Sequence, residues 1–132
     1  MTIPEYISSQ PAERQEFMTA LHEVIMANDK SVVPMIEPMM GKEMILYKEK
    51  CYMKYGLSGV KNYISLHCMP IYMNPVLHGK YADLLPAAKL QKGCINFTDA
   101  AEMPVEIAAG LITDCAGISI AAMLENRNKK KK

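Results

Sequence analysis

The sequence predicts an α+β domain built on a four-stranded antiparallel sheet, and three observations lead to this fold class. The stretch from Met44 to Tyr72 is rich in tyrosine and alternates apolar with polar residues, which is the pattern of β-strands. Helical patterns with one apolar side flank this stretch and need an apolar surface to pack on. A shorter alternating stretch, Cys94–Thr98, follows later. We therefore expect a three-strand meander plus one later strand, with the helices chiefly on one face.

The three consecutive strands are expected at Met44–Lys48, Cys51–Leu57 and Lys61–Tyr72. The turns between them, at Glu49–Lys50 and Ser58–Gly59, are short enough to make neighbouring strands antiparallel. In the second strand, alternation assigns one set of residues to the core side of the sheet: Cys51, Met53, Tyr55 and Leu57. The set expected on the other side is Tyr52, Lys54 and Gly56.

Alternation in the third strand separates two chemically different faces. The apolar face, which should receive the helices, carries Ile64, Leu66 and Cys68. The other face mixes aromatic, hydroxyl and imidazole groups, and it carries Tyr63, Ser65, His67 and Met69. Pro70 indicates an edge, a bulge or the end of the strand. The pattern therefore places His67 on the side of the sheet away from the packed helices.

Helical patterns account for most of the remaining chain. Thr2 is a suitable N-cap for a short first helix. Pro34 and Pro38 prevent a long helix in their neighbourhood and leave a single turn. The further helical segments expected, that single turn included, are Pro11–Asn28, Met35–Met39, Asn74–Leu85, Ala87–Gln91, one that opens at Pro104, and Ser119–Glu125 beyond a break at Gly117.

The chain length of 132 residues suits one domain, expected over residues 1–126 with a disordered Lys-rich tail at 127–132. The formal net charge is +1, but four positive charges belong to Lys129–Lys132, so residues 1–128 carry −3. A mildly acidic body without a basic face argues against a nucleic-acid binder. The N-terminus lacks a basic start and a long apolar run, so no signal peptide is expected. No apolar run has membrane-spanning length, so a cytoplasmic protein with reduced thiols is expected, with no membrane partner.

Sequence motifs for metal, cofactor or catalytic chemistry are missing. The four cysteines form no Cys-x-x-Cys pair, so a zinc ribbon is excluded and no metal ligand set is assigned. The seven glycines form no phosphate-binding or dinucleotide fingerprint, so no cofactor is expected. The sequence pattern indicates no two acidic residues that face each other and could serve in general acid–base catalysis. The sequence therefore does not support an enzymatic function, and no catalytic residue is assigned.

The strand around His67 holds the one local group of residues that suggests a site. His67 is interpreted as a structural histidine bonded to Ser65 or to a backbone carbonyl, as a ligand contact, or as a catalytic group. His67 and Cys68 point to opposite faces, so a metal site would need Cys94 or a carboxylate from elsewhere. Cys94 is either a small apolar residue at a strand entry or a thiol whose pKa Lys92 lowers. The candidate ligand-binding residues are Tyr63, Ser65, His67, Lys92 and Cys94.

Methionine is abundant, with 12 in the chain. Seven of them fall in the middle third: Met35, Met39, Met40, Met44, Met53, Met69 and Met73. Methionine is a flexible side chain that fills irregular core space and also lines adaptable binding surfaces. The cluster is therefore either core filling or a soft surface for a partner or an apolar ligand.

Residues 65–72 read Ser-x-His-x-Met-Pro-x-Tyr. This motif looks like a signature of one branch of the YdhG-like family, which is defined as a domain of unknown function. Residues 5–7 and 11–14 resemble the family's opening, and residues 92–97 resemble its Gly-Lys-x-Cys-x-x-Phe segment with the glycine after the lysine. Pro104 and the helix after it match the family's end, whereas Met39-Met40-Gly41 replaces its Met-Pro-x-Tyr. The resemblance, over about residues 3–116, implies an α+β fold with an antiparallel sheet.

The leading hypothesis is a non-enzymatic domain that binds an unknown small molecule or protein through the mixed sheet face. The first alternative comes from the resemblance, because some YdhG-like proteins have been discussed as frataxin-like iron carriers. An iron chaperone of this kind would use the loose acidic set Glu13, Glu16, Glu23, Asp29 and Glu37. The second alternative is a self-associating homodimer with a Met- and Tyr-rich interface.

Overall fold

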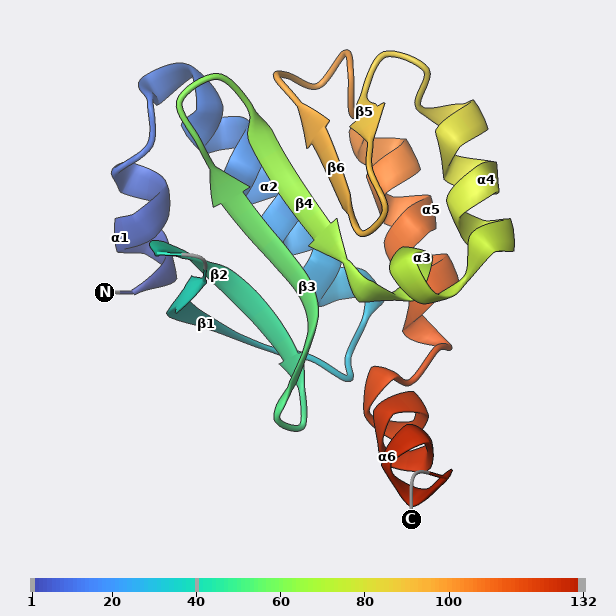
Figure 1. The fold of residues 1–132 in the computed structure, drawn as a ribbon. Coiled ribbons are helices and arrows are strands. Elements are labelled where there is room, and N and C mark those ends of the chain that lie inside the picture. Colours follow the sequence, from blue (N-terminus) through green and yellow to red (C-terminus); the bar gives the residue numbers. More distant parts are fainter. Residues whose placement is uncertain (1, 40, 131–132) are drawn as a thin grey trace.

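Six strands form an antiparallel sheet in the order β1-β2-β3-β4-β6-β5 (Figure 1). The computed structural model describes residues 2–39 and 41–130. The strands are β1 (Val33–Met39), β2 (Lys42–Glu49), β3 (Tyr52–Gly59), β4 (Ile64–Cys68), β5 (Lys89–Leu90) and β6 (Cys94–Phe97). The helices are α1 (Ile3–Ser8), α2 (Ala12–Asn28), α3 (Met69–Met73), α4 (Pro75–Leu84), α5 (Val105–Ala116) and α6 (Ile120–Lys130). The α+β class and the antiparallel sheet are thus confirmed, and the four predicted strands correspond to β2, β3, β4 and β6.

Strand β1 was wrongly predicted as a single helical turn, and its prolines explain why. Pro34 and Pro38 remove hydrogen-bond donors, which argues against a strand inside a sheet. Here β1 is an edge strand that pairs with β2 alone. The two prolines are four residues apart, so both missing N–H groups belong to the same side of the strand. An outer edge needs no donors on that side, and the sheet therefore gains a strand there. Gly41, at φ +81°, follows in the turn to β2.

Two further segments differ from the sequence predictions, one because it is too short for a helix and the other because it contains a proline. Ala87–Gln91 was predicted as a helix, but Lys89–Leu90 pair with β6 and form the second edge of the sheet. A segment of five residues is too short to be a stable helix by itself, whereas β6 offers it hydrogen-bond partners. The third predicted strand ends at Cys68, and α3 begins at Met69. Pro70 lies in the first turn of α3, where a missing N–H costs nothing.

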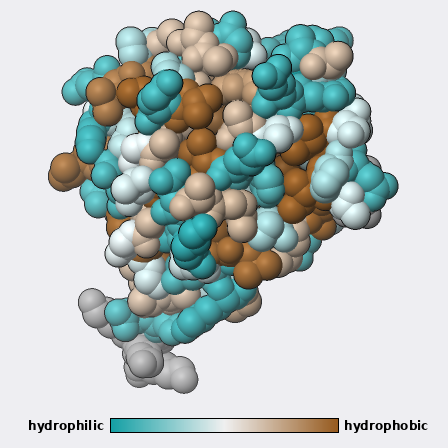
Figure 2. All heavy atoms as spheres, turned by 180° about the vertical axis from the view of Figure 1, so that it is seen from behind, coloured by the Kyte–Doolittle hydropathy of each residue, from teal (hydrophilic) through white to brown (hydrophobic). Residues whose placement is uncertain are grey.

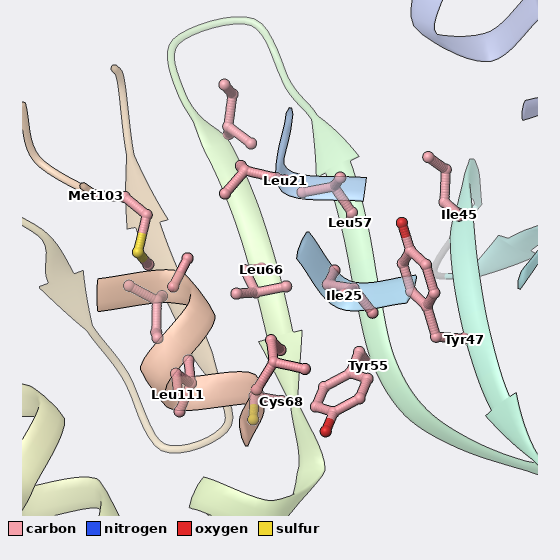
Figure 3. Packing of buried hydrophobic residues seen from close by; sticks show 14 of the residues in the cluster. Leu21, Ile25, Ile45, Tyr47, Tyr55, Leu57, Leu66, Cys68, Met103 and Leu111 are labelled. Atoms are coloured by element: carbon pink, nitrogen blue, oxygen red, sulfur yellow. The ribbon is translucent and has the colours of Figure 1, made fainter. Parts of the chain in front are cut away.

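Helices α2 and α5 lie side by side behind the sheet and cover one of its faces (Figure 1). Leu21 and Ile25 of α2 point toward the strands from which Leu57 and Leu66 project (Figure 3). Each of these four side chains is 2% exposed or less. Burial of a leucine or isoleucine side chain stabilises a fold by roughly 1.5–3 kcal/mol. This contact layer covers one face of the sheet, and the long helices α2 and α5 do not cover the opposite face.

A β-bulge in β3 moves Lys54 to the helix-covered face. Tyr47 pairs with Tyr55, but the next residue of β2, Lys48, pairs with Met53, so Lys54 has no partner residue on β2. The extra residue reverses the alternation. Lys54 is buried under the helices, and Met53 lies on the open face beside His67. The predicted placement of both residues was therefore wrong, and Cys51 lies exposed in the hairpin turn.

The predicted N-cap of the first helix, Thr2, is confirmed. The Thr2 hydroxyl accepts a hydrogen bond from the Glu5 N–H, and the Glu5 carboxylate accepts one from the Thr2 N–H. This reciprocal capping box fixes the start of α1. At the other end, α6 continues through residues 127–130, which were predicted to belong to the tail; Lys131 and Lys132 lie outside the described residues.

Among the described residues, no single helix has the length and apolar character to cross a membrane. Within the same residues, one pair of helices bent by 41°, α5 together with Ile120–Asn126, meets those two criteria. The side of the molecule seen in Figure 2, opposite to the view of Figure 1, shows hydrophilic residues interspersed with hydrophobic ones.

Candidate functional site

The face of the sheet opposite to α2 and α5 carries a cavity of about 210 Å³. Strands β1, β2, β3, β4 and β6 contribute to its walls, together with the loop that joins β3 to β4. The residues on which its chemistry depends are Met44, Tyr63, Ser65, His67, Cys94 and Asn96. The exposed Lys42 and Glu43 contribute the charged groups of its lining. The cavity thus combines a mostly uncharged interior with a few polar side chains.

Pairing between β4 and β6 places four of these side chains next to one another as two adjacent cross-strand pairs. Ser65 lies opposite Asn96, and His67 lies opposite Cys94. The Cys68 N–H donates to the Gly93 carbonyl at 2.9 Å, which makes those two residues the hydrogen-bonded pair. Pair types alternate along antiparallel strands, so His67 and Cys94 form a non-hydrogen-bonded pair, the type in which side chains approach most closely. The imidazole and the thiol are therefore neighbours on one face.

Gly56 lies beneath the imidazole and keeps the cavity open. It pairs with His67 across β3 and β4. A Cβ atom at this position would lie 3.3 Å from the Met44 Sδ and 3.4 Å from the His67 Cβ. Any larger residue would therefore press the thioether and the imidazole apart. The glycine allows both side chains to lie over the same part of the sheet.

Asn96, which lines the cavity, carries a buried acceptor that lacks a hydrogen-bond partner. Within the described part of the chain, Asn96 Oδ1 is the buried side-chain oxygen or nitrogen atom without one. The nearby Cys94 thiol donates to Gln91 Oε1 at 3.1 Å, and Ser65 is only 5% exposed. Leaving a buried acceptor unsatisfied costs about 1–3 kcal/mol. A donor brought into the cavity would recover that cost.

Burial keeps the two titratable groups of the pair uncharged. It lowers the pKa of His67 below its ordinary value of 6.5, so the imidazole is neutral at pH 7. Burial also raises the pKa of the Cys94 thiol, and a hydrogen bond with Ser65 opposes this only in part. The suggestion that Lys92 lowers the pKa of Cys94 was therefore wrong. The pair offers a neutral imidazole and a protonated thiol.

The structure brings together four of the five candidate residues. Tyr63, Ser65, His67 and Cys94 line the one cavity, whereas the exposed Lys92 lines a separate hollow beside Tyr72 and His78. Sequence reasoning missed Asn96, Met44 and Gly56. Asn96 was within reach, because in β6 it alternates with the inward-facing Ile95 and Phe97 and must share the face of Cys94. Met44 and Gly56 depend on the register between strands, which no local pattern reveals.

The acidic residues named for an iron chaperone do not converge. Asp29 is buried in an ion pair with Lys54, and Glu37 pairs with Lys48 at 2.6 Å. Glu13, Glu16 and Glu23 are exposed along α2. Across residues 2–39 and 41–130, no group of three or more His, Cys, Asp or Glu side chains is placed to hold a metal ion.

Fold and site together define an α+β protein whose antiparallel sheet is covered by helices on one face and hollowed on the other. The chain matches no protein-family model, no curated protein and no solved structure. Membership of the YdhG-like family stays a prediction that rests on the motifs alone.

The stability of the fold should decrease as the pH falls from 7.5 to 5. Burial lowers the folded-state pKa of both His22 and His67, so each unfolded imidazole binds a proton near pH 6.5 before the folded one does. The unfolded state then holds more protons than the folded state, so the free energy of unfolding must decrease as the pH falls. Urea denaturation at several pH values measures this, and the double variant His22→Gln/His67→Gln should show a shallower decrease. An equal slope in the variant would contradict the assignment.

Proposed function

We propose that this protein binds a small, neutral and largely apolar molecule that donates a hydrogen bond to Asn96. The observation that carries the proposal is that Asn96, a residue that lines the cavity, has a buried Oδ1 without a hydrogen-bond partner. Binding sites for small molecules are mostly apolar hollows with a few placed polar groups, and this cavity has that composition. A cavity of about 150 Å³ is enough to hold benzene, so about 210 Å³ accommodates a compound of at least that size.

The protonation states of the site favour binding over catalysis. A nucleophilic cysteine needs a lowered pKa, and burial moves the pKa of Cys94 in the opposite direction. The imidazole of His67 is neutral and half-buried, which suits packing against an uncharged ligand. These features support a ligand that is held and released without being transformed.

Chemical-shift mapping with a library of uncharged fragments tests the proposal. Compounds that carry an N–H or O–H donor should shift the amide signals of Ser65, His67 and Asn96. Replacing Asn96 with alanine removes the acceptor and should weaken these compounds about 3–10-fold, the equivalent of one hydrogen bond. The matched control is Asn62→Ala, since Asn62 is exposed outside the cavity and should not alter binding.

Two results would contradict this function. The first is that saturating fragments shift only signals outside the cavity, for example around Lys92. The second is that Asn96→Ala and Asn62→Ala bind every fragment as the wild type does. Retained amide dispersion in both variants shows that the fold is intact, so the comparison reports binding alone.

The two alternative functions remain predictions with their own measurements. The iron-chaperone hypothesis requires calorimetric iron binding that weakens when Glu13, Glu16 and Glu23 are replaced. The homodimer hypothesis requires sedimentation that changes with protein concentration. Its supporting observation is that Tyr63 and Tyr72 are 39% and 56% exposed, although both have large apolar rings.

A further inference from the structure

Sulfur-bearing side chains gather beside the cavity on the open face of the sheet. An open hollow of about 410 Å³ adjoins it, and its lining includes Met39, Met53, Met69, His67 and Cys94. His67, Cys94 and Met39 line both hollows, whereas Met53 and Met69 line only the outer one. Three methionines, one cysteine and one histidine thus line a single recess that is open to solvent.

These five side chains come from five different elements. Met39 ends β1, Met69 begins α3, and the β-bulge turns Met53 of β3 toward this face. His67 and Cys94 are the cross-strand neighbours on β4 and β6. The sheet fixes the backbone positions of that pair, while the unbranched methionine side chains have three rotatable bonds with which to close on a bound ion.

The donor atoms of the recess match a soft monovalent metal. Thioether and thiolate sulfur select Cu(I), and neutral imidazole also suits copper, whereas harder divalent ions require carboxylate or carbonyl oxygen. His67 is half-buried on the lining of this recess, so one nitrogen of its imidazole ring is available as a ligand. Cys94 coordinates as a thiolate, which means that its Sγ–H proton passes to solvent when the Sγ–Cu bond forms. No electron is transferred in this step.

We propose that His67, Cys94, Met53 and Met69 form a copper(I)-binding site at this recess, with Met39 as an adjacent thioether. The site does not rest on the ligand proposed for the cavity, because Met53 and Met69 have no part in that cavity. It shares His67 and Cys94 with the cavity, so bound copper and a bound molecule should compete.

Competition with a coloured copper(I) chelator under anaerobic conditions tests the site. The wild-type protein should withdraw one equivalent of Cu(I) from the chelator. Loss of an outer-shell partner of a metal typically costs 10–100-fold in affinity, so His67→Ala and Cys94→Ser, which remove direct ligands, should each weaken binding by roughly 100-fold or more. Met53→Leu and Met69→Leu preserve side-chain volume and should each weaken it by roughly tenfold.

Matched controls separate this site from adventitious binding by sulfur. Cys51 is an exposed thiol in the β2–β3 hairpin turn, and Met26 lies on α2 across the sheet. Cys51→Ser and Met26→Leu should retain both the affinity and the single equivalent. The proposal is overturned if the wild type withdraws no copper, or if Cys51→Ser loses binding while Cys94→Ser keeps it.

A spectroscopic readout and a crossed pair of variants complete the test. X-ray absorption of the copper complex should show sulfur and nitrogen neighbours, and sulfur neighbours alone would remove His67 from the site. Asn96→Ala should leave copper binding unchanged and weaken fragment binding. The double variant Met53→Leu/Met69→Leu should weaken copper binding and leave fragment binding unchanged. The two variants therefore distinguish failure of one proposal from failure of the other. Circular dichroism of every variant checks that the fold is retained.

Discussion

Replacing Lys54 with methionine should lower the free energy of unfolding by about 3–5 kcal/mol, as measured by urea denaturation. Lys54 is fully buried, and its Nζ lies 2.8 Å from the Asp29 Oδ2 at the end of α2. The Tyr55 hydroxyl donates to the same oxygen at 2.8 Å, and Ser31 donates to Oδ1. Methionine keeps much of the volume but leaves the Asp29 carboxylate in the interior without its counter-charge.

The pH dependence of this variant follows from the same contacts. Burial acts to raise the pKa of Asp29, but hydrogen bonds from Lys54, Ser31 and Tyr55 together outweigh it and lower the pKa. A lowered pKa contributes stability above the unfolded value of 3.8, and that stability is lost as the pH falls through the interval below it. Without Lys54 the largest opposing hydrogen bond is gone, so the wild type should lose more stability on acidification than the variant.

A second ion pair supplies the control. Lys80 and Asp114 are 2.6 Å apart, yet their side chains are 53% and 34% exposed. Ion pairs in contact with water are worth about 0.2–1 kcal/mol, so Lys80→Met should change the stability by no more than that. Equal losses in the free energy of unfolding for Lys54→Met and Lys80→Met would contradict the importance of the buried ion pair. The double variant Asp29→Leu/Lys54→Met should be less destabilised than the two single effects combined, because it leaves no unpaired charge.

Replacing Leu66 with alanine should lower the free energy of unfolding by about 2–5 kcal/mol. Leu66 lies in the middle of β4 between Leu57 of β3 and Ile95 of β6, and it is 1% exposed (Figure 3). Truncation removes apolar contacts and leaves a void that the surrounding strands and helices fill only in part. Since folded proteins of this size are stable by about 5–15 kcal/mol, the variant should lose a large share of its stability.

The same substitution at an exposed leucine is the control for this prediction. Leu84 ends α4 and is 44% exposed, so Leu84→Ala should stay within about 0.5 kcal/mol of the wild type. Thermal and urea denaturation of both variants give the comparison. A small loss for Leu66→Ala, close to that of Leu84→Ala, would show that β4 does not lie in the core.

The sequence by itself determined the features that depend on neighbouring residues. Alternation from Ile64 to Cys68 places Leu66 under the helices and His67 on the open face, as predicted. The N-cap at Thr2 and the helix start at Asn74–Pro75 were equally readable, because caps act within one turn. Such signals are local, and each is complete within a few residues.

The tertiary structure alone decided which segments lie beside one another. The edge position of β1 makes its two prolines harmless, and the bulge at Lys54 exchanges the faces of Lys54 and Met53. Pairing of β4 with β6 sets Cys94 and Asn96 against His67 and Ser65, which turns scattered polar residues into one site. Register between distant strands depends on the packing of the whole sheet, and a shift by a single residue would send these side chains to the opposite face.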